Sequence, residues 1–202
     1  MAKEKKCKAC GISYITTRPL QKACSLPCAV ILGRQRTEKE QKQKAKAERA
    51  ADRVKLEAFK KRSAWLNEAQ DAFNKFIRTR DELQNYPCIC CGKYPAPDDW
   101  TRGGIWDAGH FLGRGAYPEL RFEETNCHRQ LKTCNGGSNK YAKKGRTVSQ
   151  GYKAGLVDRI GLEKVEWLEG PHEPKHYTIE ELKEIKRKYT EMTKALLQKF
   201  NR

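Results

Sequence analysis

Residues 106–115 read WDAGHFLGRG, and they lie between two cysteine-containing stretches, PCICCGK at 87–93 and NCHRQLKTCNGG at 126–137. Glycines within the quoted segment let the backbone bend and approach other groups closely. His110, one of four histidines in the chain, is therefore expected to be held by the backbone and open on one side. Such a position suits a general base, and it also suits a polar turn that has no chemical role.

The cysteines of the flanking stretches are spaced as metal ligands. Cys88 and Cys91 form a Cys-x2-Cys pair that a glycine follows, and Cys134 is a third candidate. Cys90 is not expected to join them, because neighbouring residues cannot easily point at one metal ion. In a reducing compartment, such cysteines bind Zn²⁺ more readily than they form disulfides.

A second group of cysteines lies near the start of the chain, in the stretch CKACGISYITTRPLQKACSLPC at 7–28. Two pairs at this spacing can place four thiolates tetrahedrally around Zn²⁺. The sequence predicts a zinc knuckle over residues 1–29, and its four ligands are expected to be Cys7, Cys10, Cys24 and Cys28. Unrelated free thiols are the alternative.

The charge of the chain indicates an anionic partner. Its 202 residues contain 42 Lys and Arg against 25 Asp and Glu, a formal net charge of +17. Residues 1–62 hold 18 Lys and Arg and 6 Asp and Glu, so +12 of that charge lies in the first third. Nucleic acid is the first candidate for such a surplus. No apolar run is long enough to span a bilayer and no signal peptide is apparent, so we expect a cytoplasmic protein without a membrane partner.

Most of the remaining chain is predicted to be helical. Residues 30–62 are rich in Lys, Glu, Gln and Ala, which favours a basic helix that is either a solvated linker or a contact to phosphates. Residues 63–83 carry one apolar helical face, with Ser63 as the expected N-cap. Residues 147–168 repeat such a pattern with a break at Gly161. Thr178 and Glu181 form a capping box that opens a last helix through about residue 200.

The order Cys-x2-Cys, His, Asn, Cys-Asn resembles that of the ββα-metal (HNH) nucleases. Longer motifs, among them CICCG, WDAGHF, ELRFEETNCHRQ and RIGLEKVEWLEGPHEPKHYTIEELKEIKRKY, are similar to the phage NinG (Rap) recombination endonuclease family. The resemblance covers essentially the whole chain. It implies an endonuclease that cleaves branched recombination intermediates, Holliday junctions among them, with DNA and other recombination proteins as partners.

The periodicities of the sequence predict an α+β fold that is mostly helical, and the resemblance adds a small hairpin core. A small ββα hairpin at about 86–146 would form the core of a nuclease domain spanning residues 63–202. Where the HNH pattern has a further zinc cysteine, this chain has Leu131. The fourth ligand of the central zinc site is therefore expected to be Cys127 or His128, and a site with three protein ligands, or an unfilled one, stays open.

The resemblance also implies roles for the polar residues of the hairpin. His110 would be the general base, since imidazole titrates close to neutrality. Asn135 and Asp107 would hold a catalytic Mg²⁺ through oxygen atoms, although Gly109 occupies the place where many HNH members have the acidic ligand. Asn126 would fix the hairpin and orient His110. Phosphate contacts are expected from four basic residues: Arg114, Arg121, Arg129 and Lys140.

Two questions stay open on the sequence alone. The same hairpin could be a structural module in a non-catalytic, zinc-dependent DNA-binding protein that assists recombination. Symmetric resolution of a four-way junction would favour a homodimer. The basic helix is the obvious place for that contact, but its apolar residues are too sparse for a strong coiled coil.

Overall fold

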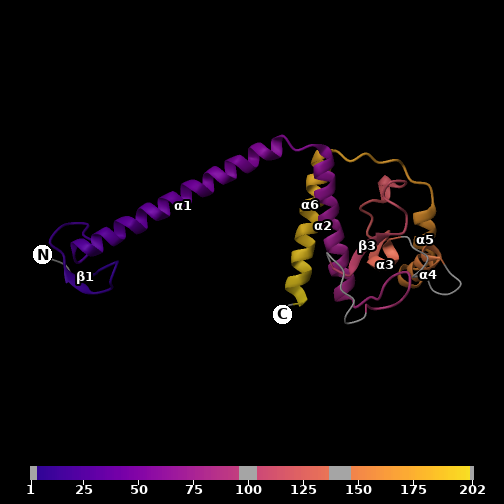
Figure 1. Cartoon of the computed structure of the whole chain (residues 1–202), viewed down its shortest axis with the longest axis horizontal. Helices are drawn as coiled ribbons and strands as arrows, with labels where there is room; N and C mark the ends of the chain where they lie inside the picture. Colours follow the sequence, from indigo (N-terminus) through magenta and orange to yellow (C-terminus); the bar gives the residue numbers. More distant parts are fainter. Residues whose placement is uncertain (1–3, 96–103, 137–146, 201–202) are drawn as a thin grey trace. The chain divides into compact units, whose positions relative to one another are not determined.

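The computed structural model describes residues 4–95, 104–136 and 147–200 (Figure 1). The chain divides into two compact units, residues 1–60 and 61–202. Helices dominate both units and each contains one small two-stranded sheet, so the predicted mostly helical α+β class is confirmed. None of the described helices combines the length and apolar composition that crossing a membrane requires.

The first unit consists of a small hairpin and one long helix. Strands β1 (Glu4–Lys6) and β2 (Ser13–Ile15) pair antiparallel, and α1 spans Leu26–Ala58. The Ser25 side chain accepts a hydrogen bond from the Cys28 backbone N–H and caps the helix, as serine commonly does. The predicted basic helix therefore begins earlier than expected, inside the cysteine-rich stretch. Helix α1 buries no residue, so its stability comes from local helix propensity and capping.

The first and last helices of the second unit lie side by side (Figure 1). They are α2 (Arg62–Leu83) and α6 (Ile179–Phe200). Their facing sides bury aromatic rings, and Phe73 meets the rings of Phe122 and Tyr189 edge to face. The predicted apolar face over 63–83 is confirmed. The predicted N-cap is wrong, because Lys61 occupies the N-cap position and makes no side-chain cap bond.

The predicted capping box at the start of α6 is confirmed. The Thr178 hydroxyl accepts from the Glu181 backbone N–H, and the Glu181 carboxylate accepts from the Thr178 backbone N–H. The predicted break at Gly161 is also present. It has φ +88 and separates α4 (Val148–Ile160) from α5 (Leu162–Glu169).

A two-stranded hairpin lies at the centre of the second unit. Strands β3 (Trp106–His110) and β4 (Cys127–Leu131) pair antiparallel, with Gly109 opposite His128. A short 3₁₀ helix, η1 (Pro118–Leu120), lies in the connection, and α3 (Lys132–Asn135) follows β4 directly.

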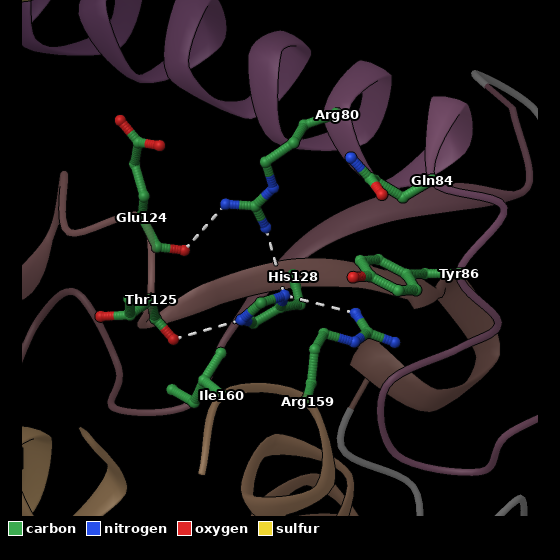
Figure 2. Close-up of a pocket in the computed structure, with 8 residues that line it drawn as sticks. All are labelled: Arg80, Gln84, Tyr86, Glu124, Thr125, His128, Arg159 and Ile160. Carbon is green, nitrogen blue, oxygen red and sulfur yellow. Dashed lines mark hydrogen bonds between the residues drawn. The ribbon is translucent and has the colours of Figure 1, made fainter. Parts of the chain in front are cut away.

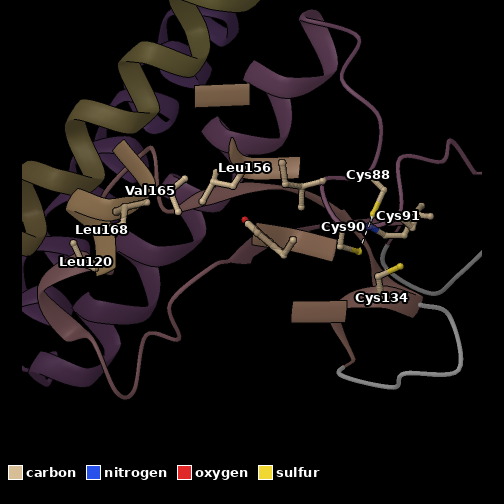
Figure 3. Packing of buried hydrophobic residues seen from close by; sticks show 11 residues of the cluster. Cys88, Cys90, Cys91, Leu120, Cys134, Leu156, Val165 and Leu168 are labelled. Atoms are coloured by element: carbon tan, nitrogen blue, oxygen red, sulfur yellow. Dashed lines mark hydrogen bonds between the residues drawn. The ribbon is translucent and has the colours of Figure 1, made fainter. Parts of the chain in front are cut away.

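Helices α4 and α5 complete a separate apolar cluster around the central cysteines. Leu156, Val165 and Leu168 are fully buried there (Figure 3). Helix α4 approaches the cysteine loop closely at a glycine. A Cβ built on Gly155 would lie 2.0 Å from the Ile89 carbonyl oxygen. Only glycine permits this approach of helix to loop.

Candidate functional site

Four cysteines converge beneath the hairpin in the second unit. Their sulfur atoms all lie within 4.8 Å of one another and all four residues are buried (Figure 3); they are Cys88, Cys90, Cys91 and Cys134. Four sulfur donors at this separation fit a tetrahedral Zn²⁺ site, and they would fill its coordination, which is typical of structural zinc. Thiol hydrogen bonds from the neighbouring Cys90 and Cys91 lower the pKa of Cys88, so this group is the readiest to bind as a thiolate.

The fourth member of this cluster corrects the expectation from sequence. The fourth cysteine of the central cluster is Cys90, in place of the expected Cys127 or His128. The backbone turns sharply after the pair: the Gly92 N–H donates to the Cys88 carbonyl, and Gly92 has φ +67. Because of this turn, the adjacent residues Cys90 and Cys91 both direct their sulfur atoms toward the centre of the cluster. Cys127 faces His110 instead, at 3.6 Å between Sγ and Nδ1.

The N-terminal cluster has the same chemistry in a more open setting. The sulfur atoms of Cys7, Cys10, Cys24 and Cys28 also lie within 4.8 Å of one another, as the spacing predicted, but only Cys7 is buried. The Cys24 backbone N–H donates to the Cys7 sulfur at 3.4 Å. Backbone donation from Cys10 lowers the pKa of Cys7, which favours a thiolate. This set also fits Zn²⁺.

His110 ends strand β3 and is held from two sides. Its Nε2 lies 3.0 Å from the Arg121 carbonyl oxygen, so Nε2 carries the proton and donates, which leaves Nδ1 as the acceptor. The ring lies 6.0 Å from that of Phe73. Burial lowers the pKa of His110 to about 4, and the charges of Arg114 and Arg121 contribute. At neutral pH the imidazole is therefore uncharged and can accept a proton.

Nδ1 of His110 faces a group that keeps its own proton. Burial raises the pKa of the Cys127 thiol, so this side chain can offer only a weak S–H donor to the imidazole. The Sγ to Nδ1 distance of 3.6 Å lies within hydrogen-bonding range for a sulfur donor, and Nδ1 is the acceptor site that a proton transfer would use.

Asn126 is fully buried and ties the connection between the strands together. Its Oδ1 accepts from the Leu112 N–H at 2.9 Å, and its Nδ2 donates to the carbonyls of Leu112 and Leu120 at 3.1 Å each. Arg121, whose carbonyl holds His110, follows Leu120 directly. The Asn126 amide thus bonds to the residue that directly precedes Arg121.

Asp107 and Asn135 come together at the surface. The Asn135 Nδ2 donates to the Asp107 Oδ2 at 3.0 Å, which brings residues of β3 and α3 into contact. Since side chains alternate along a strand, Asp107 and His110 extend from opposite faces of β3. Oxygen ligands for a hard cation are present, but the Asn135 amide would have to turn its oxygen toward the ion.

The predicted phosphate contacts divide into three groups. Arg114 is exposed, and Arg121 is partly exposed with its guanidinium bonded to the Gln70 side chain and the Arg114 carbonyl. Arg129 is a correction: it is 5% exposed, bonds to the Tyr86 carbonyl and lies 4.1 Å over the Trp106 ring. It is a core cation that cannot reach a phosphate. Lys140 lies outside the described residues.

A buried polar network that the sequence did not reveal explains the position of His128 (Figure 2). Arg80 and Arg159 both approach its Nδ1, at 3.1 and 3.3 Å. Guanidinium groups can only donate, which favours an unprotonated Nδ1 although the Asp81 Oδ2 lies 3.5 Å from it, and Nε2 lies 3.2 Å from the Thr125 carbonyl oxygen. Burial lowers the pKa of His128, which agrees with a neutral ring.

Asp81 completes this network and is fully buried. Its carboxylate accepts from the Arg80 Nε at 2.8 Å and from the Arg129 backbone N–H at 2.7 Å. The network links α2, β4 and α4 beside an open pocket of about 200 Å³ that Arg80, His128 and Arg159 line. Nothing in the local pattern RTRDEL distinguishes this aspartate from a solvated one, so the sequence offered no signal for it.

Comparison with known proteins gives one consistent result. The NinG family profile, described as Bacteriophage Lambda NinG protein, matches residues 1–199. Protein ninG of Escherichia phage lambda is 36% identical over 184 residues, which cover 86% of this chain and 82% of the relative. Protein ninG of Escherichia phage 933W is 37% identical over 173 residues, 79% of this chain and 78% of the relative. Protein ninG of Salmonella phage P22 is 35% identical over 184 residues, with 86% and 83% covered. No solved structure gives a significant match.

Proposed function

Since the chain belongs to the NinG family, we propose that it is a metal-dependent DNA endonuclease of the HNH type that cleaves branched recombination intermediates, Holliday junctions among them, during phage homologous recombination. The observation that carries the proposal is the environment of His110. A neutral imidazole is fixed by a backbone carbonyl at 3.0 Å, and the Asn126 side chain locks the loop that supplies this carbonyl by accepting one hydrogen bond and donating two.

His110 acts as the general base in this proposal. Its Nδ1 takes a proton from water, the water oxygen forms a bond to phosphorus, and the phosphorus bond to the leaving oxygen breaks. The Arg121 carbonyl keeps Nε2 protonated, so only Nδ1 receives the proton. Because burial lowers the pKa of His110, its imidazole is unprotonated at neutral pH and can accept the proton from water.

Asp107 and Asn135 would hold the proposed catalytic Mg²⁺. Because Asp107 and His110 extend from opposite faces of β3, the ion, when bound, would neutralise charge on the phosphate backbone and would not contact the water that His110 activates. Two protein oxygens leave most of the coordination to water and substrate, as is common for this ion. Arg114 and Arg121 lie close enough to lower the pKa of His110, so they are the basic groups best placed to contact the phosphate backbone beside it.

Cleavage of a four-way DNA junction tests the proposal. Purified full-length protein, with zinc bound, should cut the junction in Mg²⁺ and should bind without cutting in Ca²⁺. Asn135→Ala should raise the Mg²⁺ concentration needed for half-maximal rate, and Asp107→Asn should do the same if that carboxylate is a ligand. Asn67→Ala, an exposed position on α2, is the matched control and should leave the rate unchanged.

A non-catalytic DNA-binding accessory protein is the second candidate. The observation in its favour is that the Asn135 amide nitrogen, and not its oxygen, faces Asp107. Absence of cleavage by the wild-type protein in Mg²⁺ and Mn²⁺, with tight junction binding retained, would select it.

A further inference from the structure

The first unit contains a basic groove between the cysteine cluster and the first turns of α1. Its volume is about 900 Å³. It is lined by four cationic residues, Lys8, Arg18, Lys22 and Arg36, and none of the described residues that line it is acidic. Two leucines that water reaches freely, Leu20 and Leu26, lie along it at 85% and 82% exposure.

The cations of this groove are held in place by the backbone. The Lys8 N–H donates to the Lys22 carbonyl at 3.0 Å, which brings two segments of the knuckle, and their lysines, together. Arg36 pairs with Glu40 on α1 at 2.8 Å. Within the described part of the chain, no acidic side chain forms an ion pair with Lys8, Arg18 or Lys22. These three exposed charges are therefore available to an anionic ligand.

Leu20 lies in a turn that ordinarily avoids leucine. The Gln21 N–H donates to the Arg18 carbonyl at 3.3 Å, Pro19 occupies the second position and Leu20 the third, with φ +68. This is the geometry of a type II turn, in which glycine or asparagine is usual at the third position. Leucine is unfavourable at this position for two reasons: its backbone has a positive φ, and its apolar side chain is exposed to water.

The Gln21 side chain keeps this turn in shape. Its Oε1 accepts from the backbone N–H and the hydroxyl of Thr17, at 2.9 and 3.1 Å, and its Nε2 donates to the Ala23 carbonyl at 2.9 Å. The Tyr14 hydroxyl donates to the Gln21 carbonyl at 2.8 Å. These bonds hold the backbone of the turn, which presents one exposed apolar side chain, Leu20, between Arg18 and Lys22.

We infer that this groove binds the phosphate backbone of branched DNA and that Leu20 packs against an unstacked base step at the branch point. Exposed lysine and arginine supply the sequence-independent attraction to phosphates. Apolar wedges insert between base steps and partly unstack them, which costs free energy, and a branch point already lacks part of its stacking. Branched DNA as the ligand rests on the proposed function.

The bound zinc offers a competing explanation for part of the charge. Four thiolates carry more negative charge than one Zn²⁺ neutralises, so nearby lysines also compensate the cluster. That explanation gives no role to Leu20, since an apolar side chain neutralises nothing. Variants at Leu20 and at the lysines consequently separate the two explanations.

The Leu20 arm of the test uses a four-way junction with 2-aminopurine at the branch point, bound by full-length protein in Ca²⁺ so that no strand is cut. Wild-type protein should increase the fluorescence through unstacking. Leu20→Gly, which tolerates the positive φ, should abolish the increase and lower the preference for junction over linear duplex about tenfold. Leu56→Ala, a 71% exposed leucine on α1, is the matched control and should behave as wild type.

The charge arm combines Lys8→Gln, Arg18→Gln and Lys22→Gln. The slope of log affinity against log salt should fall by about 0.9 for each phosphate that the variant no longer neutralises. Lys164, Lys194 and Lys199, each changed to Gln, remove the same charge from exposed positions of the second unit and should leave the slope unchanged. Zinc content of every variant is measured in parallel.

The outcomes of these experiments distinguish failure of the groove proposal from failure of the nuclease proposal. Unchanged fluorescence and junction preference in Leu20→Gly overturn the wedge, even if the wild-type protein cuts junctions. Loss of zinc from the triple variant, with Leu20→Gly binding as wild type, overturns the groove in favour of charge compensation. A wild-type protein that unstacks the branch point and never cuts in Mg²⁺ supports the groove and removes the nuclease.

Discussion

The two cysteine clusters offer the same four sulfurs to a metal and differ in what surrounds them. The central cluster is fully buried and continuous with an apolar core that includes Leu156 and Leu168. The N-terminal cluster has one buried cysteine, and the helix that leaves it, α1, buries no residue. Zinc bound at both clusters would therefore reinforce a core in the second unit and substitute for one in the first.

Zinc removal should have the largest effect and should act unequally on the two units. A strong chelator should unfold the β1–β2 knuckle outright, because structural zinc supplies about 10–16 kcal/mol of apparent folding free energy in small zinc modules. The α2–α6 pair should keep its structure. Amide NMR spectra with and without chelator measure this, and metal analysis beforehand should give close to two zinc per chain. Equal loss of signals in both units would contradict the difference.

Cysteine substitution should distinguish Cys90 from Cys127 at the central site. Cys90→Ser should reduce zinc content from two to one per chain, because the sulfur of Cys90 completes the set of four. Cys127→Ser should keep both zinc ions, since Cys127 faces His110. Metal analysis of the two purified variants provides the readout, and loss of zinc from Cys127→Ser would restore the ligand expected from sequence.

Adding one methyl group to a glycine should have opposite effects in the two units. Gly155→Ala forces a Cβ against the Ile89 carbonyl and should lower the free energy of unfolding by about 1–3 kcal/mol. Gly33→Ala, on α1 with nothing within 4 Å, should raise helix stability by about 0.5–1 kcal/mol. Denaturant unfolding of the second unit and helix content of the first measure the two changes. A stabilised Gly155→Ala would show that α4 does not contact the cysteine loop closely.

Mild acid should destabilise the second unit through His110 and His128, because burial lowers the pKa of both side chains. The folded pKa of His110 is about 4 against an ordinary 6.5, so the unfolded chain binds the proton first. Stability is then complete above pH 6.5 and is lost as the pH falls toward 4. Between pH 6.5 and 5 the loss should reach about 1–2 kcal/mol. His110→Gln should flatten this dependence, and an equally steep dependence in that variant would exclude His110 as its source.

Local patterns predicted the helices, the N-terminal cysteine cluster and three of the four cysteines of the central cluster. The apolar period of 63–83, the capping box at Thr178 and the paired cysteine spacing each follow from short-range chemistry. Cys90 could not be found this way, because its role depends on a turn that lets adjacent residues meet one point. The Asp81 network and the burial of Arg129 also could not be predicted from the sequence. A charged residue on a helix or strand gives no sequence signal that a third element covers it.

The most direct test of the central claim is single-turnover cleavage of a four-way junction by wild-type protein and His110→Ala, with and without added imidazole. Binding is measured separately in Ca²⁺, and His176→Ala, an exposed histidine, is the control. His110→Ala should bind normally and cut about 10²–10⁴-fold more slowly, and imidazole should restore part of the rate. Cleavage by His110→Ala at the wild-type rate would contradict the assignment of His110 as the general base.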